Sequence, residues 1–159
     1  MIDVSSVSFF EDLIMRFVNS EIPHEDNRIF VTELASCLRA SYFRRVKPVK
    51  YLGSHAIRLF IGLAVHELLE KLLLDYLQGS NAEVKREIKI VVDGDEVTIA
   101  GRTDFIMLNS DELIIEVKVV NKLPRSPLPP HKKQLLYYLA MFDIDRGVLL
   151  YISRGGRLR

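Results

Sequence analysis

Two acidic side chains and one lysine lie within a short stretch of this chain, at spacings that are typical of a metal-dependent reaction centre. Asp104 ends the tetrapeptide 101–104, and Glu116 and Lys118 follow it, separated from each other by a single residue. Two carboxylates can bind a hard divalent cation through their oxygens. A lysine beside them can orient an attacking water and stabilise the charge that develops on phosphorus. The trio therefore predicts phosphodiester hydrolysis.

The spacing of the trio predicts that it lies on two neighbouring strands. Residues 109–111 (Asn-Ser-Asp) have turn chemistry, and apolar runs flank them on both sides. A three-residue loop centred on Ser110 would place Asp104 opposite Glu116. Because side chains alternate along a strand, Glu116 and Lys118 would then share one face with Asp104. A solvated strand face with a cross-strand ion pair would have the same pattern.

The rest of the sequence predicts the elements that position these strands. Helices are expected over 6–18, 32–45 (with Thr32 as N-cap), 55–76 and 132–142, and a loop containing four prolines is expected over 122–131. Strands are expected over 84–92, 96–100, 102–108, 113–120 and 148–152, with a hairpin turn at 93–95. This order predicts an α/β or α+β fold in which helices flank one mixed sheet.

Size and composition predict one domain of 159 residues, with a mainly helical part over 1–80 and a sheet-bearing core over 81–159. The net charge of +1 does not by itself indicate a nucleic-acid partner, although a local basic rim is compatible with it. We expect no signal peptide, because no basic region precedes an apolar one at the N-terminus, and no membrane span, because charges interrupt the longest apolar stretch. The single cysteine favours a cytoplasmic protein.

Several other polar residues are candidates for the same site. His66 is a possible metal ligand, although a lone helical histidine is often a packing residue. Gly62, four residues earlier, would allow another backbone to approach closely. Gln134 and Tyr138 share one face of a helix and either orient a phosphate or water, or face solvent.

A basic and aromatic segment in the second predicted helix is a candidate for guiding a nucleic-acid strand. Its residues are Arg39, Tyr42, Arg44 and Arg45. Arginines can contact phosphates and a tyrosine can stack on bases. A solvated helix face explains the same residues equally well.

Taken in order, these motifs resemble the PD-(D/E)xK nuclease superfamily, specifically its RecB-like exonuclease branch and the CRISPR-associated exonucleases within it. The matching motifs are the segment 31–39, Gly62-x3-His66, the tetrapeptide ending at Asp104, Glu116-Val117-Lys118 and Gln134-x3-Tyr138. The resemblance covers about residues 31–152. It implies a restriction-endonuclease-like fold, in which helices flank a mixed central sheet and an N-terminal helical part precedes it.

The resemblance also implies a role for each matching residue. Asp104, Glu116, His66 and the backbone carbonyl of Val117 would bind Mg²⁺ or Mn²⁺, and Lys118 would be the catalytic lysine. The residues implied to position substrate or water are Gln134, Tyr138 and Arg102.

The chain departs from this family in its cysteines. Relatives commonly hold an iron–sulfur cluster on four cysteines, whereas Cys37 is the single cysteine here. One thiolate cannot hold a cluster. We therefore expect no iron–sulfur cluster and expect Cys37 to be a buried packing residue.

The expected function is a metal-dependent DNA nuclease, an exonuclease acting on single strands or DNA ends. Two alternatives stay open at this point: an inactive nucleic-acid-binding or assembly subunit of the kind used in CRISPR adaptation, and a structure-specific endonuclease. DNA is the expected partner. A homo-oligomer, or CRISPR or DNA-repair proteins, are possible further partners.

Overall fold

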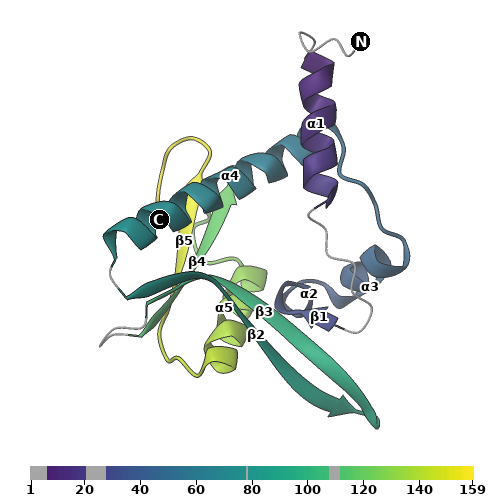
Figure 1. Ribbon diagram of the computed structural model, residues 1–159, viewed down its shortest axis with the longest axis vertical. Coiled ribbons are helices and arrows are strands. Elements are labelled where there is room, and N and C mark those ends of the chain that lie inside the picture. The colour runs from purple at the N-terminus through teal and green to yellow at the C-terminus, as the bar shows by residue number, and fades with distance from the viewer. Residues whose placement is uncertain (1–6, 21–27, 78, 108–111) are drawn as a thin grey trace.

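The computed structural model describes residues 7–20, 28–77, 79–107 and 112–159. Its centre is a five-stranded mixed sheet (Figure 1). The strands are β1 (Arg28–Phe30), β2 (Ser80–Val92), β3 (Asp95–Met107), β4 (Leu113–Val120) and β5 (Gly147–Ser153). The long strand β3 pairs with β2 in antiparallel fashion along its length, and it also pairs with β1 in parallel and with β4 in antiparallel fashion. The parallel partner of β4 is β5.

The described part of the chain also contains five helices, three of which pack on the sheet. The five are α1 (Val7–Ser20), α2 (Val31–Ala35), α3 (Leu38–Val46), α4 (Gly53–Tyr76) and α5 (Pro129–Phe142). Figure 1 shows the long helix α4 on one side of the sheet and α5 with α2 on the other. The predicted mixed sheet with flanking helices is therefore confirmed. No helix among the described residues has the length and apolar character needed to cross a bilayer.

The main hydrophobic core lies between α5 and the sheet. Its buried members are contributed by α2, β3, β4, α5 and the turn after α5: Val31, Ile106, Ile114, Leu135, Tyr138, Met141 and Ile144. Burying such side chains is the dominant favourable contribution to folding. The core therefore fixes α5 against the two strands that carry the predicted trio.

Several predicted boundaries were wrong, and each has a local cause. The helix predicted over 132–142 begins at Pro129, because proline is favoured in the first helical turn. The strands predicted over 96–100 and 102–108 form one strand, and β1 was not predicted at all. The helix predicted over 32–45 is two helices, separated where Ser36 is extended. Ser6 and the loop centred on Ser110 lie outside the described residues.

The N-cap of α2 is Phe30 and not Thr32, and Glu33 explains why. The Glu33 carboxylate accepts a hydrogen bond from the Phe30 backbone N–H (2.9 Å) and from Arg45 Nε (2.8 Å) and Nη2 (2.6 Å). Arg45 also donates to the carbonyl of Arg28. One carboxylate thus connects β1, α2 and α3 without any side chain on the N-cap residue.

Glu33→Gln is expected to lower the free energy of unfolding by about 1–2 kcal/mol at pH 7, because a charge-assisted network is lost. Burial opposes ionisation of Glu33, but the Arg45 and Phe30 hydrogen bonds outweigh it and lower its pKa. This stabilisation is present above the unfolded-state pKa and is lost as the pH falls through the folded-state pKa. Urea denaturation of both proteins at pH 7 and pH 3 checks this. An equal difference at the two pH values would contradict it.

Substitution of Gly101 and of Gly62 by alanine is expected to change the stability of the protein in opposite directions. A Cβ at Gly101 would lie 3.0 Å from Met141 Sδ and 3.1 Å from Tyr138 Cε1, so α5 packs directly on this part of β3. Gly101→Ala is expected to destabilise the protein by about 1–2 kcal/mol through overpacking. A Cβ at Gly62 would meet no described residue within 4 Å, so the predicted close approach of another backbone is not found among the described residues. Gly62→Ala should instead stabilise α4 by about 1 kcal/mol. Thermal unfolding of both variants tests the contrast.

Candidate active site

Glu116, on β4, is the most deeply buried acid of the predicted trio, with 1% of its surface exposed. Its Oε1 atom accepts hydrogen bonds from Lys118 Nζ (2.6 Å) and Gln134 Nε2 (2.7 Å). Its Oε2 atom is buried and has no hydrogen-bond partner among the described residues. Buried polar atoms are normally paired, so this carboxylate oxygen is an acceptor available to a cation.

Asp104 lies on β3 at a gap in the hydrogen-bonded ladders. The described pairing of β3 with β4 runs from Met107 to Phe105, and its pairing with β2 skips Asp104. Its Oδ2 atom accepts a hydrogen bond from the backbone N–H of Val117 (2.7 Å). Because Val117 adjoins Glu116, this bond connects the two acidic positions of the trio.

His66, on α4, faces Asp104 across the sheet surface. The distance between His66 Nδ1 and Asp104 Oδ1 is 3.5 Å. Burial alone would lower the pKa of His66, but the hydrogen bond and the charge of Asp104 outweigh burial and raise it. The third helix, predicted over 55–76, thus brings a possible nitrogen ligand to the acidic pair.

The charges around Asp104 and Glu116 favour the binding of a positive ion. Burial raises the pKa of Glu116 to about 7, with the nearby Lys118 ammonium opposing the shift and the Asp104 charge adding to it. Glu70, one turn after His66 on α4, also has a raised pKa, because of burial and the negative charges of Glu83 and Asp104. The raised pKa values mean that these neighbouring carboxyl groups bind protons more readily, which reduces the repulsion between their negative charges. A divalent cation would reduce the same repulsion.

Gln134 and Tyr138, for which solvent exposure was one open interpretation, are both buried under the sheet, at 7% and 2% exposure. The Gln134 amide also donates to the Tyr138 hydroxyl (3.1 Å). Burial and the Glu116 charge raise the pKa of Tyr138, so its hydroxyl stays protonated. Helix α5 therefore supplies a polar pair that holds the Glu116 carboxylate in place.

Other predicted residues are more exposed than this cluster. Arg102 is more than half exposed and forms a salt bridge with Glu83 (3.1 Å). Arg39 and Tyr42 lie on α3, which packs against α2 and is bound to β1 through Arg45. Arg39 stacks over the ring of Phe43, and Tyr42 is 61% exposed. The structure does not bring these two residues to the carboxylates.

Two sequence interpretations need correction. Cys37, expected to be buried, is exposed just before α3. Arg45, grouped with the strand-guiding residues, is bound to Glu33 instead.

Sequence reasoning also missed Glu70 as an electrostatic neighbour of the site. Its spacing of four residues from His66 on one helix face was the available signal.

In their positions in this structure, the side chains of the site meet the needs of a hard divalent cation only in part. Among the described residues, no group of three or more His, Cys, Asp or Glu side chains is placed to hold a metal ion. Glu116 nevertheless offers a free buried oxygen, and Asp104 is joined to the residue after Glu116. Oxygen donors of this kind suit Mg²⁺ or Mn²⁺, and Mg²⁺ usually keeps several waters.

Comparison with known proteins gives a consistent picture. The sequence model of the PD-(D/E)XK nuclease superfamily matches residues 60–156, which include His66, the trio and the Gln134–Tyr138 pair. The chain is 32% identical over 149 residues to the CRISPR-associated exonuclease Cas4 of Saccharolobus solfataricus, covering 90% of this chain and 73% of that protein. It also resembles the crystal structure of SSO0001, with a TM-score of 0.74, 27% identity, and coverage of 96% of this chain and 74% of that one. The chain therefore belongs to the PD-(D/E)XK nuclease superfamily, and over most of its length it is similar to a Cas4 exonuclease.

Proposed function

We propose that the protein is a Mg²⁺- or Mn²⁺-dependent deoxyribonuclease that removes nucleotides from single-stranded DNA or DNA ends. The observation that carries this proposal is the unpaired, buried Oε2 atom of Glu116 beside the Lys118 ammonium. Asp104, Glu116, the Val117 carbonyl and His66 would hold the cation. When bound, the cation supplies a Lewis acid and lowers the pKa of water.

The chain's own residues would then do the following work. Gln134 and Lys118 orient Glu116 through its Oε1 atom and leave Oε2 for the cation. Lys118, whose side chain is 19% exposed, can turn from Glu116 to the substrate and stabilise charge on the phosphate. His66 and Val117 fix Asp104 from two sides. Tyr138 is a positioning residue, because its hydroxyl accepts a hydrogen bond from the Gln134 amide.

Residues outside this cluster would contact the DNA further from the bond that is cut. Arg102 is exposed enough to release Glu83 and bind a phosphate. Tyr42 and Arg39, exposed on α3, would guide the strand by stacking and charge. Their distance from the carboxylates makes them binding and not catalytic residues.

The same proposal covers the domain organisation, the cofactor, the location and the partners of the protein. The whole chain would be one nuclease domain, without an iron–sulfur cluster because its only cysteine is Cys37. A cytoplasmic location suits a protein with a single, exposed thiol. Homo-oligomers or CRISPR and repair proteins are its candidate partners, by analogy with the similar Cas4 exonuclease.

The test is cleavage of labelled single-stranded DNA, as a linear and as a circular substrate, with Mg²⁺, Mn²⁺ or EDTA. We expect metal-dependent shortening of the linear strand and an intact circle. Cutting of the circle would make the protein an endonuclease. Binding without cleavage under either metal would contradict the proposal and favour an inactive binding subunit.

A further inference from the structure

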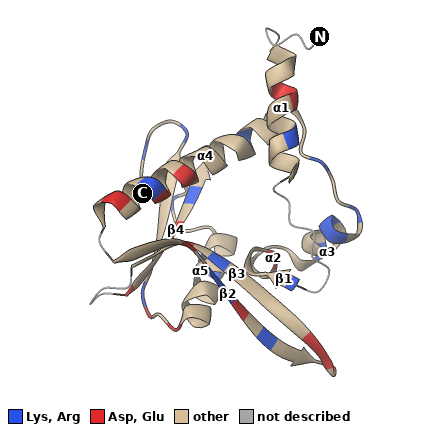
Figure 2. Cartoon of the chain, in the orientation of Figure 1, with Lys and Arg blue, Asp and Glu red and all other residues tan. Residues whose placement is uncertain are grey.

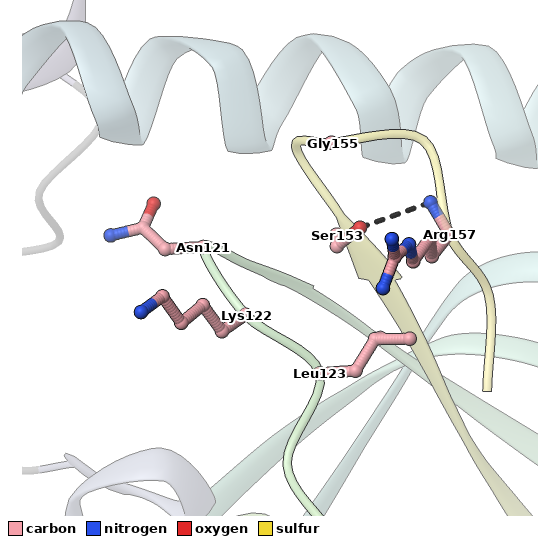
Figure 3. Close-up of a pocket in the computed structure, with 6 residues that line it drawn as sticks. All are labelled: Asn121, Lys122, Leu123, Ser153, Gly155 and Arg157. Atoms are coloured by element: carbon pink, nitrogen blue, oxygen red, sulfur yellow. Dashed lines mark hydrogen bonds between the residues drawn. The ribbon is translucent and has the colours of Figure 1, made fainter.

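A basic pocket lies beyond the end of β4, away from the two carboxylates. It has a volume of about 420 Å³. Two chain segments line it, as Figure 3 shows: Asn121, Lys122 and Leu123 after β4, and Ser153, Gly155 and Arg157 at the end of β5 and after it. The site described above uses none of these residues.

Specific hydrogen bonds build the wall of this pocket after β5. The chain turns at Gly156, which has a positive φ of 76°, and returns along the edge of β5. Tyr151 and Arg159 exchange two backbone hydrogen bonds (2.8 and 3.0 Å). The buried Ser153 hydroxyl accepts a hydrogen bond from the Arg157 N–H (3.0 Å). Arg159 Nη1 donates to the carbonyl of Pro124 (2.7 Å), which ties the two walls together.

The charge of this region differs from that of the rest of the chain. Residues 117–159 contain nine Lys or Arg and two Asp or Glu, a net charge of +7, although the whole chain carries only +1. Figure 2 shows basic residues along the loop that follows β5. Lys122 and Arg157 are exposed at the pocket, and neither forms a salt bridge with a described residue. Two cations without a carboxylate partner predict an anionic ligand.

The pocket is connected to the active site through two elements. Along β4, Asn121 follows Lys118 by three residues, which corresponds to roughly 10 Å of extended chain. Arg154 binds Asn121 and also donates to the Arg58 carbonyl on α4 (3.0 Å), the helix that carries His66. Successive phosphates of one B-form strand are about 3.4 Å apart along the axis, so one strand can reach both places.

We propose that this pocket is a phosphate subsite, in which Lys122 and Arg157 hold a phosphate of the same nucleic-acid strand that is cut at Glu116 and Lys118. This inference rests on the proposed nuclease function, and adds the place where the strand is held beside the reaction. The phosphate is either internal or the terminal phosphate of the strand. The chemistry of recognition is the same in both cases: Arg157 and the polar wall supply it, together with Lys122 once its exposed side chain, which points away from Arg157 in Figure 3, turns toward the pocket.

The test uses the double variant Lys122→Gln/Arg157→Gln in the full chain. Both side chains are exposed, so the fold should survive, and the far-ultraviolet circular dichroism spectrum checks that it does. The matched control is Lys71→Gln/Lys89→Gln, which removes the same charge from exposed positions on α4 and near the β2–β3 turn. Fluorescence anisotropy in EDTA measures the binding of linear DNA, with and without a 5′ phosphate, and of circular single-stranded DNA. EDTA separates binding from cleavage.

We expect the double variant to bind DNA about tenfold more weakly than the control. The slope of log Kd against log salt should fall by about 0.7, the value for one lost phosphate contact on a single strand. With Mg²⁺ or Mn²⁺, KM should rise with little change in kcat. An equal loss on linear and circular DNA identifies an internal phosphate, and a loss confined to 5′-phosphorylated DNA identifies the terminal one.

The two proposals fail in different ways. A wild-type protein that cuts DNA, with a double variant that binds as the control does, would overturn the subsite and leave the nuclease function intact. A wild-type protein that neither binds nor cuts DNA would overturn both.

Discussion

Lys118→Ala is expected to reduce cleavage by at least a hundredfold, the range seen when one preorganised stabiliser of developing charge is removed. Lys118 Nζ lies 2.6 Å from the Glu116 carboxylate, and its side chain keeps partial access to solvent. None of the described contacts shows another cation bound to Glu116. The loss should appear in kcat, because the charge that Lys118 stabilises develops in the transition state.

The measurement is single-turnover cleavage of labelled DNA at saturating metal, with Lys132→Ala as the control. Lys132 is an exposed lysine on α5 and carries the same charge. The control should cut at close to the wild-type rate. A Lys118→Ala protein that is folded and cuts at the full rate would remove Lys118 from the mechanism.

Glu116→Gln is expected to abolish metal-dependent cleavage and, in metal-free buffer, to make the folded protein more stable. Glu116 is almost fully buried, and burial raises its pKa to about 7 from the usual value of 4.5. The wild-type protein therefore becomes less stable as the pH rises from about 4.5 to about 7, since the unfolded carboxyl ionises first. Above that range the carboxylate costs about 3 kcal/mol at most, and an amide avoids this cost.

The stability gain of Glu116→Gln is expected to depend on pH. Urea denaturation in EDTA should show no gain for Glu116→Gln at pH 4, and a gain that grows until about pH 7. Added Mn²⁺ should stabilise the wild-type protein more than the variant, because only the wild type retains the charged oxygen ligand. Glu112→Gln, at an exposed position just before β4, is the control. A variant that is less stable than the wild type at pH 8 would show that the carboxylate is already satisfied without metal.

Long, regular elements were predictable from the sequence because their signals are local. Helix α4 and strand β4 lie within two residues of the expected ranges, and the Asp93-Gly94 turn has the positive φ values that such hairpins need. Strand β1 was missed because three residues show no periodicity. The break between α2 and α3 was missed because Ser36 leaves the helix while Glu33 bonds to residues on both sides of α2.

The candidate site was predictable to the extent that its residues recur in ordered motifs. The comparisons confirm the superfamily that those motifs indicated. The sequence did not show that Glu116 would be buried, since a Glu-x-Lys pattern equally describes a solvent-facing strand. It also did not distinguish Gln134 and Tyr138 from a solvent-facing stripe, because helical spacing shows which residues share a face but not what covers that face.

The sequence by itself determined which side chains were available for chemistry and which segments carried them, because residue type and periodicity are properties of the chain alone. The tertiary structure decided the burial, the contacts and the pKa values of those side chains. Packing of α5 on the sheet buries Glu116, raises its pKa and leaves Oε2 unpaired. The approach of α4 places His66 beside Asp104, and the return of the chain along β5 forms the basic pocket. Burial, distance and local charge depend on residues far apart in the chain, so only the folded arrangement sets them.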